Sequence, residues 1–234
     1  MHPSATAFSI DRPRAAFAEA ATRLRRLSPD YPRVYAVAAM AEQGKRRWWG
    51  LQEGLDSGRV DLMYRRATAE MSSVSAAADV VATSLIHAVI GRVVASLVLD
   101  GRAWDPGIEN LSIHLDSDGG IDWAGVDDTT IRLLPDDSLA GQTGTVTVPC
   151  EQALALWAAH RSMTALDAIY ERLSMCADLD YRRFWGIVGE AVVGAATHVP
   201  MLGSAPATVG MRRGQAVLDA IANAGRPVRG VKAA

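Results

Sequence analysis

A carboxylate and an imidazole share one face of the helix that residues 181–198 are expected to form. Glu190 and His198 lie eight residues apart, and Gly186 and Gly194 stand one turn before and one turn after the carboxylate. Such a pair can act as acid and base. The glycines, which are costly inside a helix, would then leave room for a ligand beside Glu190. Alternatively, they allow another backbone to approach closely while an arginine pairs with Glu190. Both interpretations stay open.

A second imidazole, His87, lies inside the most apolar segment of the chain, residues 76–99, five positions before Arg92. A histidine in such a segment is either a core residue satisfied by a hydrogen bond or a group that titrates for a function. Together, Glu190, His87 and His198 are the candidate catalytic residues.

The cluster Lys45-Arg46-Arg47-Trp48-Trp49 combines three cations with two large aromatic side chains. It suits an anionic, ring-bearing ligand held by charge and stacking. The alternative is a helix end with a solvated basic face. Neighbouring tryptophans on a helix point in different directions, so at least one of them should pack inward.

Composition limits the other kinds of site. The two cysteines, Cys150 and Cys176, cannot supply four thiolates to a cluster or a zinc site, and the five histidines show no metal-binding spacing among themselves. Phosphate-binding, dinucleotide-binding and hydrolase motifs are missing. We therefore expect no metal and no cofactor. A net charge of −2, from 24 basic and 26 acidic residues, argues against a general nucleic-acid binder.

Residues 76–99 are long enough to span a bilayer, but Asp79, His87 and Arg92 would be costly in hydrocarbon. A buried core helix is the better interpretation, and no membrane span is expected. The first residues lack the apolar segment and cleavage motif of a secretory signal, which predicts a cytoplasmic protein.

Hydrophobic periodicity predicts a mostly helical α+β domain with a small central antiparallel sheet. An Asp118-Gly119 turn joins two alternating segments into a hairpin. The expected helices cover residues 14–27, 34–41, 76–99, 151–173, 181–198 and 211–222, with a further one around 64–66. The expected strands lie at 111–115, 121–123, 130–134 and 145–148.

Three segments in order resemble the siderophore–iron reductases of the FhuF type. Residues 83–101 are similar to that family's long apolar helix with its interior histidine and arginine, and residues 111–135 to its strand-rich stretch. Residues 182–195 resemble its W-G-N-x-x-x-A helix, with Trp185 and Gly186 kept and Ile187 in place of the asparagine. The resemblance implies a single domain over 1–234 and is strongest over 75–200.

In that family a [2Fe–2S] cluster is held by four cysteines just after the domain, whereas this sequence has no cysteine after Cys176. The resemblance therefore implies a protein without a C-terminal iron–sulfur segment. It would bind a ferric siderophore or a similar small molecule and assist iron release, while a partner reductase or a diffusible reductant supplies the electron. The candidate ligand-binding residues are Arg46, Trp48, Trp49, Arg92 and Trp185.

Two alternatives accompany this hypothesis. The chain could be an enzyme of specialised metabolism that reuses the same cavity for acid/base chemistry on a small molecule, with Glu190, His87 or His198 as the reacting groups. It could also be a structural or regulatory subunit without a ligand.

Overall fold

The most apolar part of the chain forms one long central helix. A computed structural model describes residues 15–31, 34–44 and 47–229. In it, α4 (Val74–Ile86), a π-helical turn η4 (His87–Gly91) and α5 (Arg92–Asp100) follow one another without a break. The Ser73 side chain caps the start, and Gly101, with a φ of +69°, ends the helix in a left-handed conformation.

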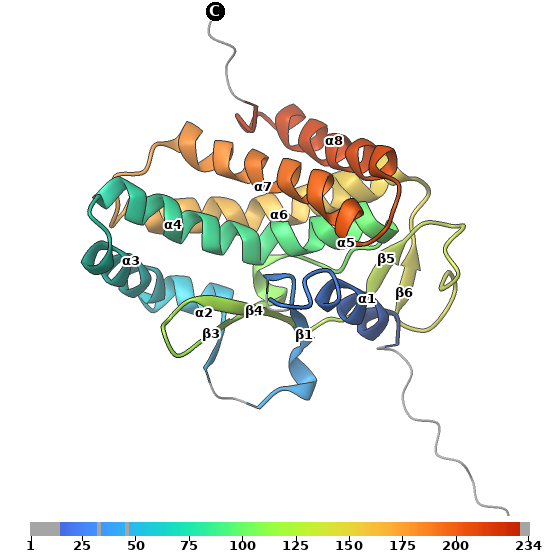
Figure 1. Cartoon of the computed structure of the whole chain (residues 1–234), viewed down its shortest axis with the longest axis horizontal. Coiled ribbons are helices and arrows are strands. Elements are labelled where there is room, and N and C mark those ends of the chain that lie inside the picture. Colours follow the sequence, from blue (N-terminus) through green and yellow to red (C-terminus); the bar gives the residue numbers. More distant parts are fainter. Residues whose placement is uncertain (1–14, 32–33, 45–46, 230–234) are drawn as a thin grey trace, which may run out of the picture.

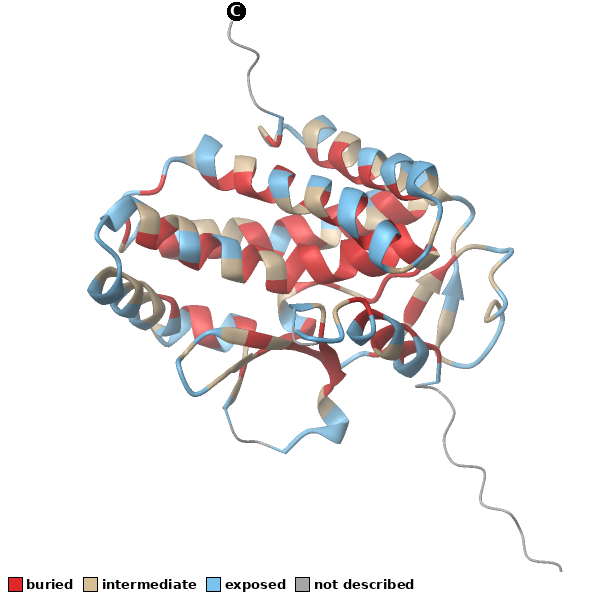
Figure 2. Ribbon diagram, in the orientation of Figure 1, coloured by how far each residue is buried: buried red, intermediate tan, exposed pale blue. Residues whose placement is uncertain are grey.

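By length and composition this 27-residue helix is apolar enough to cross a membrane, with a mean hydropathy of 1.8, and 78% of its most apolar stretch is buried within the protein. Figure 2 shows nearly continuous burial along α5, whereas buried and exposed residues alternate along α4. The structure therefore places the segment in the core of a globular fold.

Three long helices pack around this central helix, α6 (Glu151–Ser174), α7 (Tyr181–Leu202) and α8 (Ala207–Asn223). All of them lie on one side of the main sheet (Figure 1). The shorter helices are α1 (Ala15–Arg25), α2 (Leu51–Asp56) and α3 (Arg59–Glu70), with 3₁₀ turns η3 (Met40–Glu42) and η5 (Ile108–Asn110). The mostly helical α+β class is confirmed.

The main sheet has the strand order β1-β4-β3-β2. Its strands are β1 (Val37–Ala39), β2 (Trp48–Gly50), β3 (Leu111–Leu115) and β4 (Ile121–Val126). The predicted hairpin is confirmed, since β3 and β4 pair in antiparallel fashion around Gly119, whose φ is +84°. The sheet is mixed because β1 joins β4 in parallel, and a second pair, β5 (Ile131–Leu133) and β6 (Thr145–Thr147), is parallel as well.

The helix expected over residues 34–41 is wrong. Three of those residues form β1, with Val37 opposite Ala124, and a short 3₁₀ turn follows. The segment is rich in alanine and locally favours a helix. Pairing with the edge of β4 satisfies its backbone instead and buries all three strand residues. The tryptophans of β2 likewise lie on a strand, where neighbouring side chains point to opposite faces.

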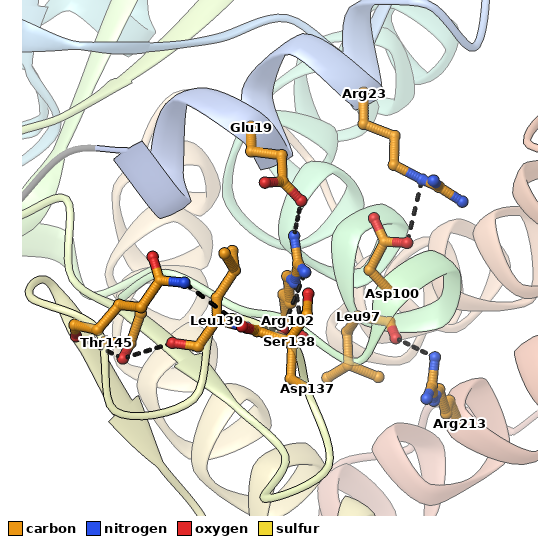
Figure 3. Close-up of polar contacts among 11 residues, drawn as sticks. Glu19, Arg23, Leu97, Asp100, Arg102, Asp137, Ser138, Leu139, Thr145 and Arg213 are labelled. Carbon is orange, nitrogen blue, oxygen red and sulfur yellow. Dashed lines mark hydrogen bonds and ion pairs between the residues drawn. The ribbon is translucent and has the colours of Figure 1, made fainter. Parts of the chain in front are cut away.

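A cluster of ion pairs holds α1 and the β5–β6 connection against the end of the central helix (Figure 3). Arg102 donates from Nε and Nη2 to the two carboxylate oxygens of Asp137, at 2.7 and 2.9 Å, and from Nη1 to Glu19 at 2.7 Å. Beside them, Arg23 pairs with Asp100 at 3.0 Å. A bidentate pair of this kind, with both side chains below 10% exposed, fixes the geometry of the elements that it joins.

One of the glycines in α7 marks a close backbone approach. A Cβ added at Gly189 would lie 2.1 Å from the carbonyl oxygen of Val228, in the segment that follows α8. That segment is anchored by Arg226, which donates to Asp167 at 2.6 Å. By contrast, a Cβ at Gly186, on the same helix, would meet nothing within 4 Å.

These surroundings predict opposite effects of one substitution at two positions. Gly189→Ala should lower the free energy of unfolding by about 1–3 kcal/mol, because the methyl group collides with backbone that is held in place. Gly186→Ala should raise it by up to about 1 kcal/mol through helix propensity. Urea denaturation of both variants measures the difference. Equal effects at the two positions would contradict the close approach at Gly189.

Candidate functional site

A cavity of about 310 Å³ lies between the central helix and α7. We call it the His87 cavity. The central helix contributes one wall, α7 contributes the other, and the segment just before β1 closes one side. The lining residues are Tyr35, Thr83, His87, Gly91, Ile187, Glu190, Ala191, Gly194, Ala195 and His198. All three candidate catalytic residues therefore border one space, although His87 is more than 100 positions from Glu190 and His198 in the chain.

The π-helical turn determines how His87 sits. The backbone N–H of Arg92 donates to the carbonyl of His87, five residues earlier, so the turn is wider than that of an α-helix. Gly91 lies beneath the imidazole, and a Cβ added there would be only 2.5 Å from His87 Nδ1. The missing side chain thus allows the ring to rest against the helix backbone. Turns of this type occur frequently at functional sites.

The surroundings of His87 keep its imidazole neutral. Burial, assisted by the positive charge of Arg92, lowers the pKa of His87 to about 4. Nδ1 is buried and has no hydrogen-bond partner among the described residues. The ring stands edge-on to Tyr35, with centroids 5.8 Å apart, and burial raises the pKa of the Tyr35 hydroxyl. At neutral pH the His87 imidazole is therefore uncharged.

Glu190 and His198 are exposed residues at the rim of the cavity. Arg183 donates to Glu190 Oε1 at 2.9 Å and to Asp79 Oδ2 at 3.0 Å, which ties α7 to α4. Glu190 therefore has the arginine partner that the sequence predicted. This partner, Arg183, comes from the same helix, and the pair lies at the surface rather than in the core. Gly194 lines the cavity, and a Cβ there would meet nothing within 4 Å.

The structure places those predicted ligand-binding residues that it describes outside the lining of this cavity. Trp185 has no exposed surface and packs edge-on against Phe184, with the guanidinium of Arg226 5.4 Å from its ring. Arg92 is 3% exposed and donates from Nη2 to the carbonyl of Asp122, in β4, at 3.2 Å. Burial lowers the pKa of Arg92 to about 10, against the opposing effect of Asp122.

The two neighbouring tryptophans separate as expected for opposite faces. Trp49 is 7% exposed and packs against Gly54, where a Cβ would overlap its ring. Trp48 lies partly exposed on the other face of the sheet. Arg46 falls outside the described residues.

The remaining potential metal ligands and the other surface depressions are weaker candidates for a functional site. Among the described residues, no three His, Cys, Asp or Glu side chains lie close enough together to hold a metal ion. Both cysteines are free; Cys150 is exposed just before α6. A larger depression of about 620 Å³ over α2 and η5 is lined by four carboxylates and by no histidine or cysteine. The His87 cavity is therefore the better candidate site.

Sequence reasoning missed three of the residues that shape the cavity. Tyr35 could not be recognised as a site residue because its segment was expected to be helical. Nothing in the sequence around Thr83 marks that residue as part of a site. Gly91 did carry one, since a glycine one turn after an interior histidine leaves space beside the ring.

Comparison of the chain with family models, with curated proteins and with solved structures gives no match. The resemblance to the FhuF-type reductases stays a prediction.

The neutral state of His87 predicts a loss of stability in acid. Between the unfolded pKa near 6.5 and the folded pKa of about 4, only the unfolded chain binds the proton, so lowering the pH favours unfolding. Relative to His87→Gln, the wild type should lose about 2 kcal/mol of unfolding free energy between pH 7.5 and pH 4.5. Urea denaturation at both pH values measures this loss of unfolding free energy. An NMR titration that gives His87 a pKa near 6.5 in the folded protein would contradict the prediction.

Proposed function

We propose that this protein binds a compact small molecule in the His87 cavity and transfers a proton on it, with His87 as the proton acceptor. One observation carries the proposal. A half-buried, neutral imidazole, whose Nδ1 has no hydrogen-bond partner among the described residues, lines a cavity whose rim holds a carboxylate and a second imidazole. A base must be unprotonated at the working pH, and the surroundings of His87 meet that condition. The same surroundings weaken the imidazole as a base, so the proton it accepts must be passed on quickly.

The cavity also limits the ligand. Its volume lies at the lower end of the range of about 300–1,000 Å³ that is usual for ligand sites. The inner walls are apolar or formed by glycine backbone, apart from His87, Thr83 and Tyr35. A compact, largely apolar molecule with a weakly acidic proton fits these walls, such as a phenol or an enolisable carbonyl compound. Glu190 and His198, being exposed, would exchange the proton with water.

Gly194→Leu tests where the ligand binds. The leucine side chain would extend into the open space of the cavity, so binding should weaken at least about tenfold while the fold persists. Ligand-observed NMR with a set of phenols and enolisable carbonyl compounds identifies binders of the wild type, and their dissociation constants are then compared between variants.

Two further variants complete this test. Gly186→Leu is the matched control, because it makes the same change on the same helix at a position that does not line the cavity. It should bind as the wild type does. His87→Gln should retain binding within a few fold but lose proton transfer, seen as exchange of the acidic C–H of an enolisable carbonyl ligand for deuterium. Equal weakening by both leucine variants would contradict the proposal.

Ferric-siderophore binding is a second candidate function, and one observation favours it. Residues 83–101 and 182–195, which carry the resemblance to the FhuF-type reductases, supply the two facing walls of the His87 cavity. On this proposal a cytoplasmic protein would receive one arm of a ferric siderophore in the cavity. A partner reductase would supply the electron that converts iron(III) to iron(II).

Titration with ferric hydroxamates and ferric catecholates, followed by tryptophan fluorescence, tests this second candidate. We expect saturable quenching by at least one ferric chelate, weaker quenching by its iron-free form, and an effect that Gly194→Leu reduces at least about fivefold in affinity. Gly186→Leu again serves as the control. The absence of quenching with every chelate would count against siderophore binding and leave the proton-transfer proposal intact.

A further inference from the structure

The face of the main sheet that points away from the long helices carries a row of three aromatic rings. In the strand register, Trp48 on β2 lies opposite His114 on β3, which in turn lies opposite Trp123 on β4. Residues opposite each other on neighbouring strands share a face. The Trp48 and His114 ring centroids are 5.0 Å apart, and all three side chains are partly exposed.

Gly125 allows this row to lie flat on the sheet. A Cβ added there would come within 2.8 Å of the Trp48 ring and 2.3 Å of the Met40 sulfur. Both side chains therefore rest on the backbone of β4, and Met40 adds apolar surface beside the aromatic row. The helix-facing side of the same strands is different, since Trp49, Ile113 and Ala124 are buried there. The aromatic row is thus separated from the His87 cavity by the thickness of the sheet.

The central ring of the row is held in a fixed orientation. His114 Nδ1 lies 2.6 Å from Asp122 Oδ1, and this carboxylate is 8% exposed. A register shift of the strand pair at His114/Leu115 brings the two side chains together. Nδ1–H donates to this carboxylate, and Nε2 makes no hydrogen bond to the described residues. A carboxylate that fixes a histidine in this way sets which edge it presents.

Arginines stand at both ends of the row. The Arg25 guanidinium lies 5.9 Å from the Trp123 ring centre. Arg47 is exposed next to Trp48 and has a φ of +66°, a conformation that costs free energy for any residue with a side chain. Its carbonyl accepts from Leu115 N–H at 3.4 Å, which joins the strained residue to β3. Cations beside exposed indole rings favour a ligand that is both aromatic and negatively charged.

We propose that this face is a second ligand site, specific for a planar aromatic anion such as an aryl carboxylate. The ligand ring stacks on Trp48 and Trp123 across the His114 ring, and Arg25 contacts its anionic group. Stacking on an exposed indole is the main source of affinity, and the cation selects for charge. This site does not depend on the function proposed for the His87 cavity.

Fluorine NMR of protein labelled with 5-fluorotryptophan tests the proposal, because the chain has six tryptophans that report separately. Naphthalene-2-carboxylate should shift the Trp48 and Trp123 resonances saturably. Cyclohexanecarboxylate, which has the charge without the ring, should not. Trp157 is the internal control, since Arg132 stacks on it at 3.8 Å on another surface. An equal, parallel shift of Trp157 would show non-specific binding and overturn the proposal.

Variants provide the second readout. Trp48→Leu should weaken naphthalene-2-carboxylate binding at least about tenfold, measured at Trp123. Arg25→Gln, at an exposed position on a helix, should weaken it about threefold and leave binding of naphthalene-2-methanol unchanged. Gly194→Leu fills the His87 cavity and should have no effect here. Binding that is insensitive to both Trp48→Leu and Arg25→Gln, in proteins whose remaining resonances stay dispersed, would also overturn the proposal.

Discussion

The rest of the fold depends on the need to bury the helix Val74–Asp100, above all its second half. Its middle and second half are almost wholly inaccessible. Helix α7 packs along α4 and α5, α8 covers α5, and the sheet lies beneath the π-helical turn. Because apolar surface of this extent is stabilising only when water is excluded from it, each of these elements has to approach closely. Glycines at the contacts between α7, α8 and the segment that follows α8 allow this close approach. Gly189, which packs against the backbone of Val228, is the clearest case.

The same helix carries Arg92 into the core and His87 to its edge, and these two side chains link the candidate sites physically. His87 opens onto the cavity beside α7, while Arg92, one turn later, reaches the backbone of β4 at Asp122. Asp122 in turn orients His114 on the outer face. The positive charge of Arg92 also helps to keep His87 neutral. A residue expected to bind a ligand therefore has a positioning role in this arrangement, and the cavity and the aromatic row share its support.

Much of the fold could be predicted because long apolar periodicities and turn residues act locally. The boundaries of α6 and the Gly119 hairpin follow from side-chain spacing and glycine conformation alone. The strand β1 could not be predicted, because its hydrogen-bond partners come from β4, almost 90 residues later in the chain. Of the site, the types and helical spacing of Glu190, His87 and His198 were readable. Tyr35 was not, because only the parallel pairing of β1 brings it beside His87.

By itself, the sequence determined the helical α+β class, the central helix with its interior histidine, and the scarcity of thiols that leaves no cysteine set for an iron–sulfur cluster. These properties depend on composition and on spacing within single elements. Only the tertiary structure decided which candidate residues share a space. It placed three titratable residues around one cavity, buried Trp185 and Arg92, and aligned Trp48 with His114 and Trp123. The reason is physical: contacts between distant segments depend on how whole helix faces and strands pack, which no local pattern specifies.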